Sequence, residues 1–267
     1  MEGVSVTLVQ LCVEYKNKQR NLASLAQQLK QCDSVGDITL LPEMFSTGYI
    51  FDSPEEIQCL SEEFTYSPTI DALTELAQQY STLFVAGVAE KDGDNYYNSV
   101  VVVDGTGLKH TYRKISQNRI DKRYFDRGSE LLTFSHKGLN FGVAICFDIW
   151  FPEIMRGYQN ADVILHPANF GGQQSFAIAH SRALENGQHI LTCNRVGEDV
   201  TSEFTAHYCG SSRAYNAQGE NTLTLGESAA CETVVINDLS IAPQYNGISL
   251  NQEIDEIRSL LNSKPLS

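Results

Sequence analysis

The sequence FGVAICFDIWFPE, residues 141–153, contains the transition around which the rest of the chain is organised. Phe141–Ile145 is a short apolar run that predicts a buried β-strand, and Cys146 follows at its end. Pro152, a residue favoured at the first position of a helix, then predicts a helix over Pro152–Gln159. A buried strand that leads into a helix is the repeating unit of α/β proteins.

The same alternation of strands and helices extends in both directions from this segment. Apolar or alternating runs predict strands over Val4–Leu11, Asp37–Leu41, Thr82–Ala89, Tyr96–Asp104, Leu108–Tyr112, Val163–His166, Ile190–Asn194, His207–Asn216, Asn221–Leu225 and Thr233–Ile236. Helical spacing and capping residues predict helices over Asn17–Gln31, Pro68–Tyr80, Phe176–Gly187 and Gln252–Leu261. Short strands joined by tight turns favour mixed sheets. Because no linker or repeat interrupts the pattern, it predicts one α/β domain over residues 1–267.

The composition restricts the classes of partner. The chain has 42% hydrophobic and 19% charged residues and a formal net charge of -14. An acidic surface repels phosphate backbones and anionic lipids, so nucleic acids and membranes are not expected partners. No apolar run approaches the roughly 20 residues needed to span a bilayer. The start of the chain, Met1–Ser5, lacks the basic region of a secretory signal, which favours a soluble cytoplasmic protein.

The chain contains seven cysteines: Cys12, Cys32, Cys59, Cys146, Cys193, Cys209 and Cys231. Their number is odd, and no two are spaced as Cys-x-x-Cys, so a zinc ribbon or a thioredoxin-like motif is not supported. In a reducing cytosol we expect most of them to be buried apolar thiols.

Three chemically complementary residues stand where predicted strands end. Glu43 follows the strand at 37–41, Lys114 follows the strand at 108–112, and Cys146 follows the strand at 141–145. Strand ends are where α/β proteins commonly place ligand sites. A carboxylate can accept the proton of a thiol, and an ammonium group can stabilise both the thiolate and an oxyanion formed by attack on a carbonyl. If Cys146 lies on a strand-to-helix turn, the backbone N–H of Phe147 is a second oxyanion donor.

Each of these residues also has an ordinary explanation. A glutamate after a strand is commonly a solvated or capping group, a single lysine is commonly surface charge, and a cysteine that ends an apolar strand is commonly part of the core. Composition and periodicity alone therefore do not establish a triad.

The surrounding motifs resemble those of the nitrilase superfamily of carbon–nitrogen hydrolases. The resemblance rests on five segments in order: LLPEMFSTGY (40–49), YRK (112–114), GVAICFDIWFPE (142–153), RALEN (182–186) and NRVG (194–197). It extends from the first predicted strand to about Ile236. The resemblance implies a four-layer α-β-β-α sandwich that assembles as a dimer or a larger homo-oligomer. It further implies a thioester acyl-enzyme, with Glu43 as base, Lys114 as oxyanion stabiliser and Cys146 as nucleophile, and no metal or organic cofactor.

One position departs from the pattern of the family. Many members carry a second glutamate between the lysine and cysteine motifs, where this chain has DKRYFDRGS (121–129). Asp121 is the expected substitute, although its side chain is one methylene shorter, and Asp126 is a less favoured one. Alternatively, Asp121 only pairs with Lys122 or Arg123 on a loop. Asn169 and Phe170 match a segment that lines the substrate pocket in the family.

Other residues have weaker claims to the site. Trp150, just after Cys146, either forms a wall of the pocket or packs as an ordinary aromatic side chain. His166 is a conceivable base for a Cys–His dyad, but a histidine in a buried strand is more often a satisfied core group. Gly171 and Gly172 fit a flexible edge of the pocket better than a phosphate-binding turn. The six histidines form no His-x-x-x-His pair that would indicate a metal site.

The sequence therefore predicts an amidase that releases ammonia or an amine from a small amide or carbamoyl compound. Nitrile hydrolysis and acyl transfer to an acceptor other than water use the same three residues and remain alternatives. A non-catalytic binding or thiol-sensing protein of the same fold is a further alternative. Three arginines, Arg119, Arg123 and Arg127, are candidates for binding a substrate carboxylate, although solvated loop charges are common at such positions.

Overall fold

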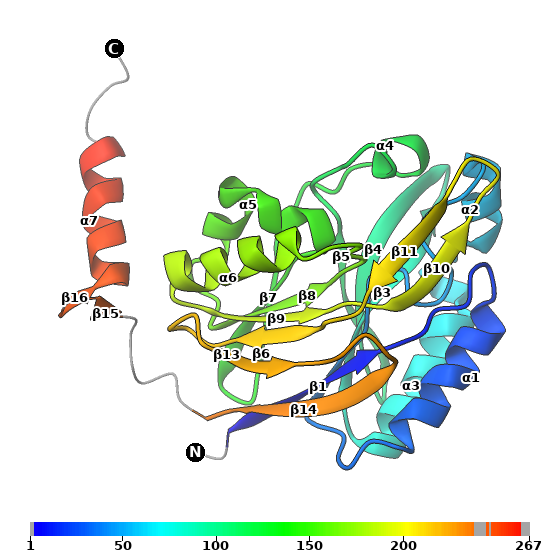
Figure 1. Cartoon of the computed structure of the whole chain (residues 1–267), viewed down its shortest axis with the longest axis horizontal. Helices are drawn as coiled ribbons and strands as arrows, with labels where there is room; N and C mark the ends of the chain where they lie inside the picture. Colours follow the sequence, from blue (N-terminus) through cyan, green and yellow to red (C-terminus); the bar gives the residue numbers. More distant parts are fainter. Residues whose placement is uncertain (1–2, 238–243, 246, 263–267) are drawn as a thin grey trace.

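Two six-stranded mixed sheets face each other in the computed structural model, which describes residues 3–237, 244–245 and 247–262. The predicted domain of residues 1–267 extends beyond these ranges at both ends. That the whole chain forms a single domain remains a prediction. Figure 1 shows the two sheets as the central layers, with helices on both outer sides.

The first sheet has the strand order β14-β1-β2-β3-β4-β5. Its strands are β14 (Ala230–Ile236), β1 (Val4–Gln10), β2 (Ile38–Leu40), β3 (Leu83–Asp92), β4 (Asn95–Asp104) and β5 (Gly107–Arg113). The pairs β1–β2 and β2–β3 are parallel, and the pairs that flank them are antiparallel. The mixed character predicted from the short strands and tight turns is thereby confirmed.

The second sheet has the same kind of arrangement, with the order β13-β12-β9-β8-β7-β6. Its strands are β13 (Asn221–Thr224), β12 (Arg213–Tyr215), β9 (His189–Cys193), β8 (Val163–Pro167), β7 (Leu139–Val143) and β6 (Leu132–His136). Here β7, β8 and β9 are parallel, and the outer pairs are antiparallel.

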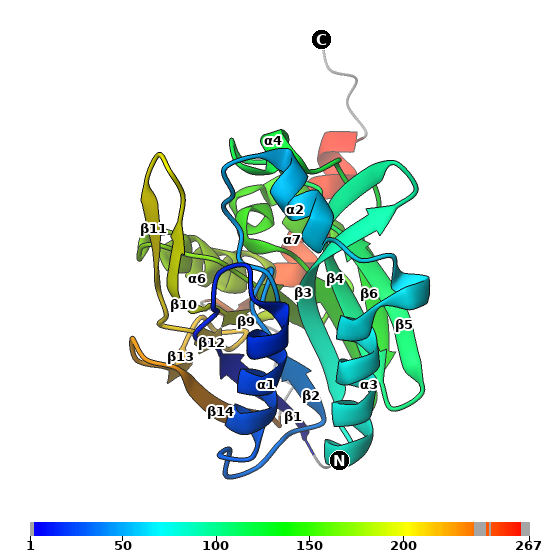
Figure 2. The ribbon, with the colours of Figure 1, turned by 90° about the vertical axis from the view of Figure 1, so that its right-hand side faces the viewer.

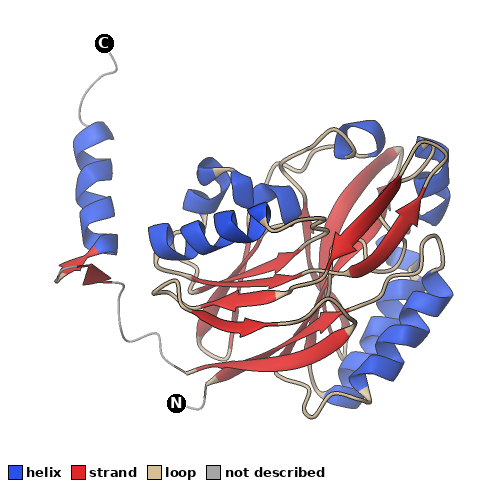
Figure 3. Cartoon of the chain, in the orientation of Figure 1, coloured by secondary structure: helices blue, strands red, loops and turns tan. Residues whose placement is uncertain are grey.

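Helices cover the outer face of each sheet and complete four layers. Helices α1 (Lys18–Leu29) and α3 (Pro68–Tyr80) pack their apolar residues on the first sheet. Helices α5 (Pro152–Gly157) and α6 (Gln174–Asn186) lie on the second sheet (Figure 3), and Figure 2 shows α1 and α3 side by side on the first. The structure confirms the predicted α-β-β-α sandwich.

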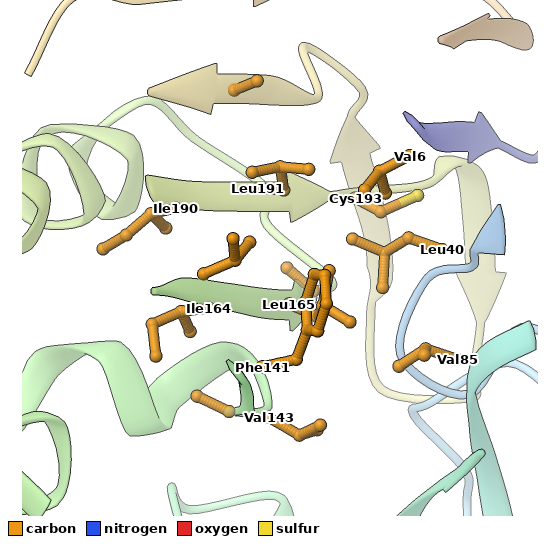
Figure 4. Packing of buried hydrophobic residues seen from close by; sticks show 14 of the residues in the cluster. Val6, Leu40, Val85, Phe141, Val143, Ile164, Leu165, Ile190, Leu191 and Cys193 are labelled. Atoms are coloured by element: carbon orange, nitrogen blue, oxygen red, sulfur yellow. The ribbon is translucent and has the colours of Figure 1, made fainter. Parts of the chain in front are cut away.

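The main core lies between the two sheets. Figure 4 shows Val6, Leu40 and Val85 of the first sheet on the side that faces Leu165 and Phe141 of the second. Parallel strands that are buried on both faces need nearly continuous apolar runs, which explains the sequence of β7 and β8. The core holds the ends of these strands rigidly, and the candidate site is built at those ends.

Smaller elements surround one end of the sandwich. They are α2 (Pro54–Leu60), the 3₁₀ turns η1 (Phe64–Tyr66) and η2 (Cys146–Trp150), α4 (Asp121–Tyr124), and the hairpin of β10 (Val196–Val200) with β11 (Thr205–Cys209). The chain continues through the short pair β15 (Gln244–Tyr245) and β16 (Ile248–Ser249) to α7 (Leu250–Asn262), which stands to one side of the sandwich (Figure 1). Within the described ranges, no helix has the length and apolar character that crossing a bilayer requires.

The predicted strand at His207–Asn216 is wrong as a single element. The chain divides it between β11, which pairs only with β10, and β12, which belongs to the second sheet. Gly210 and Ser211 separate the two strands, and both have positive φ, 60° and 57°. This left-handed backbone ends one strand and redirects the chain into the other.

The expectation that most cysteines are buried thiols is also wrong. Cys32, just after α1, forms a disulfide with Cys231 on β14. Cys12 and Cys59 are exposed, and Cys209 is half-buried. Only Cys146 and Cys193 are buried free thiols among the described residues.

Candidate active site

The structure brings Glu43 and Lys114 into direct contact. Glu43 follows β2 and is completely buried, and Lys114 follows β5 and is 2% exposed. Lys114 Nζ lies 2.8 Å from Glu43 Oε1. Two residues 71 positions apart in the sequence therefore form a buried ion pair at the shared end of their strands.

Asp121 is the second carboxylate partner of Lys114. It begins the short helix α4, is 1% exposed, and places Oδ2 at 2.9 Å from Lys114 Nζ. The shorter side chain thus reaches the lysine. Asp126 lies elsewhere, because it is exposed and accepts a hydrogen bond from the Tyr96 backbone at 3.1 Å.

Asn98, a residue that the sequence analysis did not identify, joins the two carboxylates. Its side-chain N–H₂ donates to Glu43 Oε1 at 2.7 Å and to Asp121 Oδ1 at 3.2 Å. Asn98 is buried on β4, next to the apolar run of that strand. A polar residue that is buried on a strand needs hydrogen-bond partners in the interior. The asparagine next to the apolar run of β4 was therefore the signal in the sequence by which this residue could have been found.

Cys146 lies beside the carboxylate of Glu43. The thiol is 7% exposed, and burial raises its pKa well above the usual range. The charge of Glu43 and a hydrogen bond to it raise that pKa further, whereas Lys114 opposes the increase. Glu43 Oε1 receives both Lys114 and Asn98, and Oε2 receives no hydrogen bond from a nitrogen or hydroxyl group of the described residues. The oxygen without such a partner is suited to accept the proton of the thiol.

The charges of the cluster set its resting state. Burial disfavours the ammonium form of Lys114, but the charges of Asp121 and Glu43 outweigh burial and raise its pKa well above normal. Burial, assisted by the charge of Asp121, raises the pKa of Glu43 despite the opposing effect of Lys114. At neutral pH the site therefore holds a charged lysine and a protonated thiol.

Cys146 is the first residue of η2, shortly after β7 ends at Val143, so it lies where a strand leads into a helical turn. Its φ is +44°, in the left-handed region that residues with a Cβ seldom adopt. Asp148 ties this turn to the strand of the lysine: its carboxylate accepts hydrogen bonds from Ile145 N at 2.9 Å, Ser116 N at 2.8 Å and the Tyr112 hydroxyl at 2.7 Å. Such a left-handed conformation persists only where its surroundings fix it.

Asn169 borders Cys146, and Phe170 follows it in the chain. The backbone N–H of Asn169 donates to the Cys146 thiol, and both polar atoms of the Asn169 side chain are buried without a hydrogen-bond partner among the described residues. Phe170 is buried against His166 and Phe176. Asn194 fixes this segment, because its side chain accepts from Phe170 N at 2.7 Å and donates to Phe170 O at 3.1 Å.

A tyrosine from the glutamate motif lies over the lysine. Lys114 Nζ is 5.4 Å from the centre of the Tyr49 ring. The Tyr49 hydroxyl accepts a hydrogen bond from Asn118 Nδ2 at 2.8 Å, and the backbone N–H of Asn118 donates to Asp121 Oδ2 at 3.1 Å. Tyr49 and Asn118 are thus further parts of the site that the sequence analysis did not single out.

The aromatic residues after Cys146 are more exposed. Phe147 is half-buried, and Trp150 is 38% exposed, with its indole N–H 3.2 Å from Ser175 Oγ on α6. The place of Trp150 in a pocket wall remains a prediction, as does the role of the Phe147 backbone N–H.

The other candidates lie at the margin of the site or have other partners. The three arginines 119, 123 and 127 are exposed, and so are Gly171 and Gly172. His166 is buried, but its Nε2 lies 3.0 Å from the backbone oxygen of Cys146. This contact gives the imidazole a partner other than the thiol.

Comparisons with known proteins place this geometry in a family. The model of the carbon-nitrogen hydrolase family matches residues 5–242. A protein named nitrilase from Pyrococcus abyssi is 37% identical over 207 residues, which are 75% of this chain and 78% of that protein. The omega-amidase YafV of Escherichia coli K12 is 28% identical over 91% of this chain and 92% of its own.

A solved structure supports the fold independently. The structure of XC1258 from Xanthomonas campestris, described as a CN-hydrolase superfamily protein with an arsenic adduct in its active site, superimposes with a TM-score of 0.80. The match covers 100% of this chain and 99% of that one at 21% identity. At this identity the similarity concerns the fold alone.

Proposed function

The chain belongs to the carbon-nitrogen hydrolase family, and on that premise we propose that it is an amidase whose nucleophile is Cys146. The substrate is a small amide or carbamoyl compound, and the products are the acid and ammonia or an amine. The observation that carries the proposal is that the two carboxylate oxygens of Glu43 have different partners. Oε1 binds Lys114 and Asn98, and Oε2 is left beside the thiol.

The reaction begins with proton transfer from Cys146 to Glu43. The thiolate attacks the carbonyl carbon, and the ammonium group of Lys114 and the backbone N–H of Phe147 hold the resulting oxyanion. Glu43 returns the proton to the leaving nitrogen as the carbon–nitrogen bond breaks, which leaves a thioester on Cys146. Glu43 then deprotonates a water molecule that attacks the thioester, and the thiol leaves with that proton.

Asp121 and Asn98 support this chemistry without touching the reacting atoms. Asp121 fixes the position and charge of Lys114 through a second ion pair, in addition to the one with Glu43. Asn98 fixes Glu43 Oε1 and Asp121 Oδ1 with one amide group. Preorganised dipoles and charges of this kind avoid rearrangement during the reaction. We assign both residues a positioning role.

Nitrile hydrolysis is the second candidate function, because one relative that shares 37% identity carries the name nitrilase. The same thiol would attack a nitrile carbon. The buried side chain of Asn169 favours the amide, since its free donor and free acceptor match the C=O and N–H of an amide. A nitrile offers only an acceptor and would leave the Asn169 oxygen unpaired, at a cost of about 1–3 kcal/mol.

The test is ammonia release from a panel of small amides, carbamoyl amines and nitriles. Cys146→Ala is compared with Cys193→Ala, which removes the other buried free thiol but lies at the end of β9. We expect release by the wild type and by Cys193→Ala, and none by Cys146→Ala. Release that persists in Cys146→Ala would refute the thiol mechanism. A folded protein that releases nothing would instead favour the binding or thiol-sensing alternative.

We further propose that the enzyme acts in the cytoplasm and assembles through the helices near the site. Trp150 and Phe151, before and at the start of α5, and Leu184 on α6 are exposed apolar side chains on one outer layer. Clusters of exposed apolar residues commonly mark protein interfaces. Light scattering after size exclusion should give a mass of at least two chains, and Leu184→Glu should lower it.

A further inference from the structure

His166 contacts the nucleophile through the backbone and not through the thiol. It lies on β8 with no exposed surface, and its Nε2 is 3.0 Å from the carbonyl oxygen of Cys146. Its other ring nitrogen, Nδ1, is 2.9 Å from Thr192 Oγ1. Thr192 faces His166 directly across the β8–β9 ladder, so two rigid strands fix the imidazole.

The partners of the imidazole determine its tautomer. A backbone carbonyl only accepts hydrogen bonds, so Nε2 must carry the proton that is shared with Cys146 O. In a neutral imidazole Nδ1 is then an acceptor, and the hydroxyl of Thr192 must donate to it. Burial lowers the pKa of His166 to about 4, which keeps this neutral form at physiological pH.

The carbonyl that His166 binds belongs to the peptide unit that also carries the N–H of Phe147. In a trans peptide the C=O and the N–H lie in one plane and point in opposite directions, and no described peptide bond is cis. A hydrogen bond that holds the oxygen on one side therefore aims the N–H to the other side. Donation to the carbonyl also polarises the peptide and strengthens its N–H as a donor.

We propose that His166, held by Thr192, is a positioning residue that orients the Cys146–Phe147 peptide so that its N–H binds the oxyanion. The inference rests on the proposed thiol mechanism and deepens it. It also assigns a function to the left-handed turn at Cys146, where φ is +44°. The imidazole keeps this peptide in one orientation during attack and release.

The experiment separates reactions of Cys146 that form an oxyanion from those that do not. Acylation by p-nitrophenyl acetate forms the Sγ–acyl bond through a tetrahedral oxyanion and expels p-nitrophenolate. Alkylation by iodoacetamide forms an Sγ–carbon bond by displacement of iodide, without an oxyanion. Both rates are measured on the full-length protein, and Cys146→Ala gives the background. The ratio of the two rates within one variant cancels differences in the folded fraction.

We expect His166→Leu to lower the acylation rate by up to about 100-fold, the lower end of the loss for an oxyanion donor, because the N–H of Phe147 is still present but is no longer held in place; alkylation should change less than about twofold. His166→Gln, whose amide can donate to the same carbonyl, should recover part of the loss. Thr192→Val should lower the ratio in the same direction, and Thr192→Ser should preserve it. Thr39→Val removes a comparable buried hydroxyl pair on the first sheet and should leave the ratio unchanged.

Two results would overturn the proposal. An equal fall of both rates would show that His166 only supports the thiol or the fold, and no fall in either would show that the peptide is fixed by other contacts. If His166→Leu does not fold, the Thr192 pair decides between these outcomes. The two proposals can also fail separately. If His166→Leu selectively loses ester acylation but the wild type releases no ammonia from the amide panel, the role of His166 stands and the amidase proposal is refuted.

Discussion

The buried imidazole of His166 should make the stability of this protein depend on pH in a way that one substitution removes. The folded state holds the ring neutral, because burial lowers its pKa from 6.5 to about 4, with Lys114 acting in the same direction and the Cys146 carbonyl opposing it. Above pH 6.5 the ring is neutral in both the folded and the unfolded state, so it adds no pH dependence there. As the pH falls below 6.5, the unfolded chain binds a proton that the folded chain refuses.

The size of the effect follows from the two pKa values. A difference of about 2.5 pKa units corresponds to a maximum of about 3.4 kcal/mol, which is reached only below pH 4. Between pH 7.5 and pH 5 the expected loss from this one group is about 2 kcal/mol. That loss is a substantial part of the 5–15 kcal/mol that is typical of a folded domain.

The assay is urea denaturation of the wild type and of His166→Gln at pH 7.5 and pH 5. Other acidic groups, such as Glu43 and Asp148, whose pKa values burial raises, are common to both proteins and cancel in the comparison. The wild type should lose about 2 kcal/mol more than His166→Gln on acidification. Equal losses in the two proteins would refute the claim that the fold holds this ring neutral.

Three further predictions concern the charged cluster and the disulfide. The charge of Asp121 raises the pKa of both Glu43 and Lys114. Asp121→Asn should therefore lower both pKa values, so that the acidic and the alkaline limb of the pH profile of kcat/KM both move to lower pH. Limbs that stay in place or move to higher pH would contradict this prediction. Glu43→Gln should abolish turnover and lower the free energy of unfolding by up to about 3–5 kcal/mol, because it removes one of the two carboxylates that balance the buried charge of Lys114; a variant as stable as the wild type would argue against it. The protein should titrate five free thiols before reduction and seven after it, since Cys32 and Cys231 are bonded. Breaking that bond with Cys231→Ser should cost about 2–5 kcal/mol in urea denaturation, and seven thiols without reductant would show that the bond does not form.

Local signals in the sequence predicted most of the elements. The helix predicted from Pro68 begins at that residue in the structure, where the side chain of the preceding Ser67 accepts a hydrogen bond from Ile70 N at 3.1 Å and caps α3. The short α2 and α4 were not predicted, because helices of a few residues have too little periodicity to be recognised. The predicted strand at 207–216 was divided because two consecutive left-handed residues separate β11 from β12.

The site was predictable only as far as its residues follow strand ends or match a family motif. Glu43, Lys114 and Cys146 satisfy both conditions, and the structure places them together. Asn98 satisfies neither, because its role depends on which carboxylates the tertiary fold brings to its amide. His166 was considered as a base for the thiol, but a sequence does not show whether a ring faces a side chain or a backbone carbonyl 20 residues away.

The pairing of β1 with β14 has a consequence for the order in which the chain is synthesised. Thr7 and Thr233 face each other across this pair, 226 residues apart, so β1 leaves the ribosome long before its second neighbour β14 has been synthesised. Until then β1 presents an unpaired edge, the kind of surface from which nascent chains aggregate. A chain that ends before Ala230 would keep that edge open permanently. We therefore expect chaperone dependence to fall sharply once the last strand of the sandwich has emerged.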